Sequence, residues 1–206
     1  MLSVIDKADI GLSTTLKWLL LNGNPFVIII CVMFAYFIWK KYNDTLYRII
    51  AIIPVLFTVL FGPLKNVVEV VFPFAKYVSE EIPYHGAICV ENNGMGNSVT
   101  QLQIMLFVAC CICIEVILLN DKIEGVIGDI SMILAGVASS AMLGFSPTIY
   151  ASAKRTYTTM IFCIVVVSIH IFCNNVSYIK EMKKCNFRYI MYTIILLGYL
   201  DLLMLA

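Results

Sequence analysis

Long apolar runs separated by short polar turns are the feature that most restricts how this chain can fold. Of its 206 residues, 61% are hydrophobic, a share above that of soluble domains. A helix that crosses a bilayer needs about 20 apolar residues. Runs close to this length occupy six places: 25–39, 46–62, 101–119, 126–145, 156–173 and 189–205. The sequence therefore predicts an all-α fold, a polytopic membrane helix bundle with about six transmembrane helices plus interfacial helices, in a single transmembrane domain over 1–206.

Two stretches do not fit a span. Residues 1–24 lack the basic-then-apolar order of a signal peptide, and the apolar run 15–21 is too short to cross. We therefore expect 1–24 to be an interfacial N-terminal segment. Residues 63–100 form the predicted outer loop, in which the stretch 67–78 is interrupted by charges and a proline and is interpreted as interfacial or re-entrant.

Small residues recur along the fourth run. They form one i, i+4 row at Gly128, Gly136, Ser140 and Gly144, with Ala135 and Ser139 on the row beside it. Such rows let helix backbones approach closely, and in lipid this packing drives helices together. We therefore expect this helix to lie in the middle of the bundle and to stop at Gly144 and Pro147, because a residue before proline is pushed out of helical geometry.

Charge and cysteine content exclude several classes. The formal net charge of +1 gives no overall positive potential that would attract nucleic acid. The cysteines lie mostly inside apolar runs, so we predict neither a disulfide framework nor a metal site, and no cofactor. Lys and Arg are denser in the short loops after the first, third and fifth runs, which places those loops in the cytoplasm. We expect a multi-pass protein of a cell membrane, the bacterial inner membrane, with 63–100 outside.

Polar residues inside apolar runs are costly and need a partner or a purpose. Glu115, Asp129 and His170 are predicted at similar depth near the cytoplasmic face, where they could relay protons or bind a coupling cation. The alternative, which we favour, is that all three simply reach water.

On the outer face, Lys154 and Arg155 stand close to Tyr150, opposite the loop that contains Glu69, Glu80, Glu81, His85 and Glu91. Arginine's rigid fork suits phosphate oxygens, so these three residues are our candidates for binding the phosphate of a lipid carrier. A loop carboxylate could then act as a base. Alternatively, the two cations only anchor the fifth helix to lipid headgroups. No catalytic residue is assigned.

The run GFSPTIYASAKRTY at 144–157, together with the interfacial helix and Asn-Pro entry at 19–25, resembles the C-terminal membrane half of large bacterial proteins of the GT-C type. These are glycosyltransferases that use polyprenyl-phosphate-linked sugars to decorate surface polysaccharide. The resemblance implies lipid-linked sugar chemistry on the outer face, with Arg155 as the phosphate contact. GT-C enzymes usually carry a catalytic acid in a large outer loop after their first span, whereas a short cytoplasmic loop follows it here. The chain thus looks like the C-terminal part of such an enzyme, or a shortened relative.

Two other functions stay open. Kinked and glycine-rich helices are also typical of a transporter or flippase-like module, which predicts a water-filled route from Glu115 and His170 toward the outer face. A non-catalytic membrane subunit predicts an exposed row of small residues and a partner membrane subunit. In each case membrane lipid, with or without a polyprenyl-phosphate-linked sugar, is the expected partner.

Overall fold

The computed structural model describes residues 4–22, 24–75, 96–145, 149–175 and 177, without the side chains of 74, 96–98, 143–144 and 149–156. All regular structure in this part of the chain is helical, which confirms the all-α prediction. Its helices are α1 (Val4–Leu20), α2 (Pro25–Lys41), α3 (Thr45–Phe61), α4 (Lys65–Val71), η1 (Pro73–Ala75), α6 (Gly96–Leu119), α7 (Ile123–Ala141), η3 (Met142–Phe145) and α8 (Ile149–Asn175).

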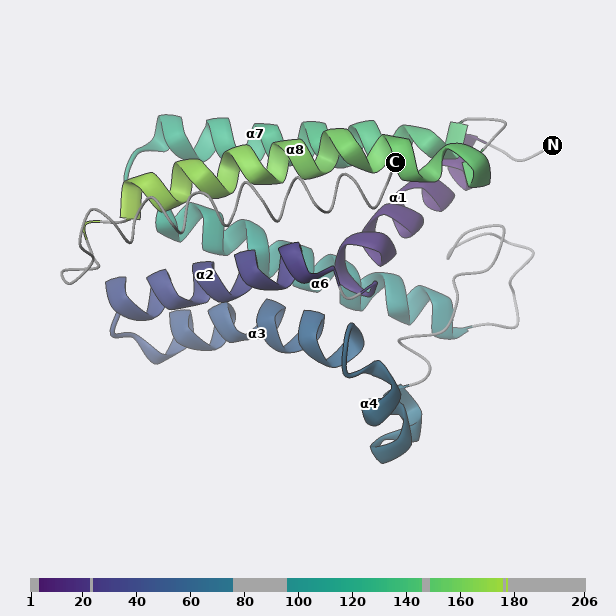
Figure 1. Cartoon of the computed structure of the whole chain (residues 1–206), viewed down its shortest axis with the longest axis horizontal. Coiled ribbons are helices and arrows are strands. Elements are labelled where there is room, and N and C mark those ends of the chain that lie inside the picture. Colours follow the sequence, from purple (N-terminus) through teal and green to yellow (C-terminus); the bar gives the residue numbers. More distant parts are fainter. Residues whose placement is uncertain (1–3, 23, 76–95, 146–148, 176, 178–206) are drawn as a thin grey trace.

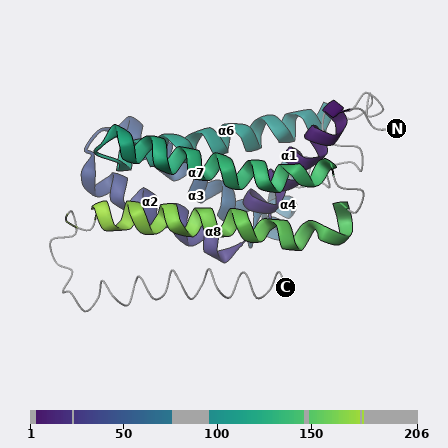
Figure 2. The ribbon, with the colours of Figure 1, turned by 90° about the horizontal axis from the view of Figure 1, so that it is seen from above.

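The helices form an elongated bundle of two pairs and a connecting helix. The α2–α3 pair lies on one side and the α7–α8 pair on the other, and α6 contacts both (Figure 1). Seen from above, α6, α7 and α8 run alongside one another, and α1 crosses near the end that carries the N-terminus (Figure 2). Aromatic and aliphatic side chains of α2, α6 and α8, among them Phe37, Leu119 and Phe172, form the larger of two buried clusters.

Three described helices are long and apolar enough to cross a membrane, over Val99–Leu119, Ile123–Ala141 and Tyr157–Asn175. Two bent pairs raise the number to as many as five: α1 with α2, bent by 72°, and α3 with α4, bent by 90°. The described chain thus has three to five candidate spans, and the predicted count of six is not confirmed. The sixth predicted span, 189–205, lies outside the described residues.

Local capping explains why α2 and α3 begin where they do. The Asn24 side chain accepts a hydrogen bond from the Phe26 backbone N–H (2.9 Å), and Pro25 stands at the first helical position, where its missing N–H costs nothing. Asp44 caps α3 in the same way, through the N–H of Leu46 at 3.1 Å. The predicted starts of the first two spans therefore lie within one residue of the observed ones.

The two stretches that were predicted not to cross are more helical than expected. The N-terminal helix extends over Val4–Leu20, well beyond the short run 15–21, and seven of its residues are buried. Three of its buried polar side chains have partners within the helix, since Ser13 donates to Asp9 at 2.8 Å and Thr15 to the carbonyl of Gly11 at 2.7 Å. In the predicted outer loop 63–100, α4 forms early and α6 already begins at Gly96.

The small-residue helix α7 was predicted at the centre of the bundle, and this prediction is wrong for the described part of the chain. Only 17% of its span is buried there, against 39% for the α6 span and 44% for the α8 span. Close packing does occur on one side: a Cβ added to Gly136 would lie 3.2 Å from both Met160 Cα and Cys163 Cβ of α8. At Gly128 such an atom would meet nothing within 4 Å. One part of the row of small residues therefore packs closely against α8, while another part, at Gly128, faces open space.

Side chains from three other segments satisfy the carboxyl end of α6. Lys41 Nζ and Tyr42 OH each donate to the Leu118 carbonyl at 2.9 Å, and Asn175 Nδ2 donates to the Leu119 carbonyl at 2.8 Å. Lys41 also pairs with Asp121 at 2.7 Å. The α2–α3 turn, the α6–α7 turn and the end of α8 thus meet at one end of the bundle, in agreement with the alternation of the predicted loops.

Gly136→Leu should destabilise the protein, whereas Gly128→Leu should not. The larger side chain at 136 forces α7 away from α8, and overpacking of this kind costs about 1–3 kcal/mol. Both substitutions remove a helical glycine, which by itself favours the helix by about 0.5–1 kcal/mol, so the pair isolates the packing effect. Thermal unfolding in detergent should give a midpoint several degrees lower for Gly136→Leu. Equal midpoints for both variants would contradict the α7–α8 contact.

Candidate functional site

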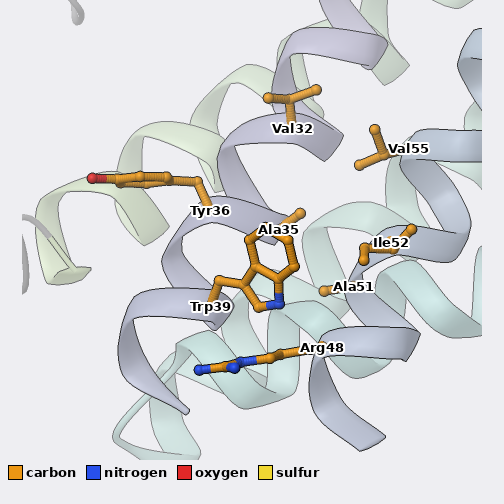
Figure 3. A pocket seen from close by; sticks show the side chains of 8 residues that line it. All are labelled: Val32, Ala35, Tyr36, Trp39, Arg48, Ala51, Ile52 and Val55. Atoms are coloured by element: carbon orange, nitrogen blue, oxygen red, sulfur yellow. The ribbon is translucent and has the colours of Figure 1, made fainter. Parts of the chain in front are cut away.

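An apolar groove with a cationic end lies between α2 and α3. Its hollow has a volume of about 270 Å³ and is lined by Val32, Ala35, Tyr36 and Trp39 of α2 and by Arg48, Ala51, Ile52 and Val55 of α3. Figure 3 shows Val32 and Val55 at one end, with Trp39 and Arg48 at the other. The side chains of Ala35 and Ala51 are too small to fill the space between the helices, which leaves the groove open.

A second hollow, of about 350 Å³, continues from the groove past Tyr36, Trp39, Lys40 and Arg48. Arg48 Nε donates to the Tyr42 carbonyl at 3.3 Å and its Nη2 to Asn43 Oδ1 at 3.1 Å, while Lys40 Nζ lies 5.8 Å from the centre of the Tyr36 ring. None of these partners is a carboxylate. Two cations therefore face the end of an apolar groove without an acid partner among the described residues.

This arrangement suits a ligand that is part hydrocarbon and part anion. Apolar side chains bind a hydrocarbon chain without loss of hydrogen bonds, and the guanidinium fork of Arg48 retains N–H donors for phosphate oxygens. Trp and Tyr at such a boundary present an apolar ring and a polar tip. This site was not predicted from the sequence, and Arg48 was counted only as a loop cation. The reason is that the groove exists only where α3 faces α2, which the sequence does not show.

A chain of hydrogen bonds joins two of the three predicted intramembrane polar residues. His170 Nδ1 lies 2.9 Å from both carboxylate oxygens of Asp129, and Asn120 Nδ2 donates to Asp129 Oδ2 at 2.8 Å. Asn174 Nδ2 lies 3.1 Å from His170 Nε2. Since a carboxylate only accepts, this pattern assigns the imidazole proton to Nδ1 and makes Nε2 an acceptor.

The polar chain opens onto a cavity. Its volume is about 340 Å³, and it is lined by Asn120, Asp121, Lys122, Glu124, Gly125, His170 and Asn174. Gly125 keeps the approach free, because a Cβ there would lie 2.7 Å from Asn120 Oδ1 and 3.4 Å from His170 Cε1. The imidazole is 42% exposed and Asp129 only 8%, so His170 connects a buried carboxylate with water.

Glu115 does not join this chain. It is fully buried, and neither of its carboxyl oxygens has a hydrogen-bond partner among the described residues. The favoured interpretation, that all three polar residues reach water, is therefore wrong for Glu115 within the chain as described. It holds for His170, and Asp129 reaches water only through its imidazole partner.

The predicted outer site cannot be compared side chain by side chain. Tyr150, Lys154 and Arg155 belong to the first turns of α8, and their side chains lie outside the described residues. Among the acids of the facing loop, Glu69 forms an ion pair with Lys65 at 3.8 Å, while 76–95 lies outside the described part.

Comparisons with known proteins found no match for this chain. No family model, no curated protein and no solved structure matches it.

Asp129→Ala should destabilise the protein more than Glu124→Ala does. Removal of the Asp129 carboxylate leaves one buried Asn120 N–H without an acceptor, which costs about 1–3 kcal/mol, and also removes the partner of His170 Nδ1. Glu124 lies exposed at the same cavity and serves as the matched control. The measurement is thermal unfolding in detergent at neutral pH. Equal midpoints would contradict a structural role for the chain of hydrogen bonds.

Proposed function

We propose that this chain is an integral membrane protein that binds a polyprenyl-phosphate-linked sugar and takes part in lipid-linked sugar transfer for cell-surface glycan modification. The observation that carries this proposal is the groove between α2 and α3, with apolar walls and, at its end, the cations Lys40 and Arg48, which have no acid partner among the described residues. The resemblance of residues 144–157 to GT-C-type proteins supports it independently.

The groove divides the ligand into two parts. The isoprenoid chain lies against Val32, Ile52 and Val55, where burial of apolar surface contributes about 25 cal/mol per Å². The phosphate lies against Arg48 and Lys40, and its oxygens accept charge-assisted hydrogen bonds, which are about twice as strong as neutral ones. The sugar then projects toward Trp39, which is 53% exposed and offers a flat ring.

The outer candidates Tyr150, Lys154 and Arg155 form a second proposed contact, at the other end of the bundle. Arg155 precedes Asn175 on α8 by 20 residues, which corresponds to about 30 Å along a helix, close to the thickness of the hydrocarbon layer. Asn175 lies at the end where Lys41 and the α2–α3 turn meet α6. The two cation sets therefore suit a carrier lipid held at either leaflet, and we assign binding of the carrier to both and a catalytic role to neither.

A transporter or flippase-like module is the second candidate function. It is favoured by the hydrogen-bonded chain from Asn120 through Asp129 to His170, which opens onto a polar cavity. Movement of a lipid-linked sugar between leaflets requires a polar path for the headgroup, whereas transfer of the sugar requires only that the carrier is held. A non-catalytic membrane subunit that holds the carrier for another chain fits the same groove.

Arg48→Gln should weaken binding of a polyprenyl phosphate by roughly tenfold or more, because hydrogen bonds to charged groups contribute about 1.5–3 kcal/mol. The measurement is native mass spectrometry of the protein, released from nanodiscs that contain a short polyprenyl phosphate. Lys122→Gln, which removes a cation at the other cavity, is the control. Equal occupancy in Arg48→Gln and wild type would overturn the groove as the carrier site.

Arg155→Ala should abolish glycan modification in a cell that depends on this protein, if the phosphate is also held at the outer end. Surface glycans are compared by electrophoresis and lectin binding, with protein abundance measured in the same membranes. Lys7→Ala, a cation of the N-terminal helix, is the control. Unchanged glycans at normal abundance of Arg155→Ala would count against the outer contact and leave the test of the groove unaffected.

A further inference from the structure

Glu115 is the polar group that the proposed function leaves unexplained. It lies in a candidate span, Val99–Leu119, about one turn before the carboxyl end, and its side chain is completely buried. Within the described residues, neither carboxyl oxygen has a hydrogen-bond partner. An ionised carboxylate in such surroundings is strongly disfavoured unless a cation or several donors compensate, so the neutral acid is the form that the apolar interior accepts.

Among the described residues, no ion pair joins Glu115 to the helices around α6. Its described ionisable neighbours are two thiols, Cys31 of α2 and Cys111 of α6 itself. On α3, the Thr58 hydroxyl already donates to the carbonyls of Pro54 and Val55.

Several charged groups of the surrounding helices are bound to other partners, and Lys40 of α2 lies over the Tyr36 ring. On α1, Asp9 accepts from Ser13, and on α2, Lys41 pairs with Asp121. The guanidinium of Arg48 on α3 bonds to the α2–α3 turn, and Asp129 of α7 is bound to His170 of α8.

A set of hydrogen-bonded polar groups begins directly after the helix that carries Glu115. Asn120, the first residue beyond α6, follows Glu115 by five positions, which corresponds to about 7.5 Å along a helix axis. Asn120 Nδ2 bonds to Asp129, Asp129 bonds to His170, and His170 lines the cavity. Asn120 Oδ1 is buried without a partner among the described residues and lies beside the Gly125 backbone at this cavity. This oxygen can therefore accept a hydrogen bond from a water molecule that carries the proton.

We propose that Glu115 is a proton-binding site buried in the bundle near the carboxyl end of α6 and that it exchanges its proton with water through the Asn120–Asp129–His170 end. The step breaks the carboxyl O–H bond; the proton leaves toward the cavity and the electron pair stays on the carboxylate. This site is independent of the groove between α2 and α3, so a failure here leaves the lipid-binding proposal untouched.

Infrared difference spectroscopy of the purified protein in lipid tests the site directly. Wild type at neutral pH should show the C=O stretching band of a protonated carboxyl, and Glu115→Gln should lack it. The band should disappear reversibly as the pH is raised. Glu124→Gln, which alters an exposed carboxyl, should retain it. Absence of a Glu115-dependent band would show that Glu115 is ionised and paired. A band that persists at every pH would show that Glu115 never releases its proton. Either result overturns the proposal.

Isotope labelling covers the case in which Glu115→Gln does not fold. Incorporation of ¹³C-labelled glutamate shifts the band in wild type if it comes from a glutamate. An ordinary glutamate has a pKa of about 4.3, so a band that persists when the pH is well above this value belongs to a buried glutamate. The route is tested by transfer into D₂O, where the band shifts as the proton exchanges. His170→Gln should slow this exchange several-fold relative to wild type and to Lys122→Gln, a substitution of another residue that lines the cavity. Equal rates in all three would overturn the route.

Discussion

The carboxyl end of α6 is the constraint on which the arrangement of the bundle depends. A helix leaves its last carbonyl groups without partners, and in an apolar interior each must be satisfied. Here Lys41, Tyr42 and Asn175 donate to the carbonyls of Leu118 and Leu119, and Asn120 folds back onto that of Val116. Because these donors come from α2, the α2–α3 turn and α8, one helix end fixes the positions of three other segments. Lys41 adds a cation where the helix dipole is negative.

The same end of the bundle positions both candidate sites. The α2–α3 turn that contacts α6 also supplies the Tyr42 carbonyl and Asn43 amide that hold Arg48 at the end of the groove. On the other side of α6, Asn120 links the α6–α7 turn to Asp129 and thereby to His170. Both sites thus depend on contacts with the same helix end.

Small side chains have two opposite effects in this fold. Glycines let backbones approach: Gly136 contacts α8 closely, and a side chain on Gly11 would collide with the carbonyl of Ala141 in α7. Between α2 and α3, in contrast, Ala35 and Ala51 are among the residues that line the groove, where their short side chains leave space open. The row on α7 predicted close packing correctly and its place in the bundle wrongly, since a periodic pattern identifies a face but not how many helices cover it.

The sequence by itself determined the helical class and the starts of α2 and α3, because apolar length and the caps Asn24 and Asp44 act locally. The prediction for α1 was too short. Its polar residues Asp9, Ser13 and Thr15 are buried because they form hydrogen bonds among themselves or with the backbone one turn earlier. Only the tertiary structure brought Asp129 to His170, left Glu115 without a hydrogen-bond partner in the part of the chain that it describes, and set Arg48 beside Trp39 at the groove. These relations join residues on different helices or depend on what surrounds them, and which helices meet is decided by packing and by satisfaction of buried polar groups, neither of which a single run of residues contains.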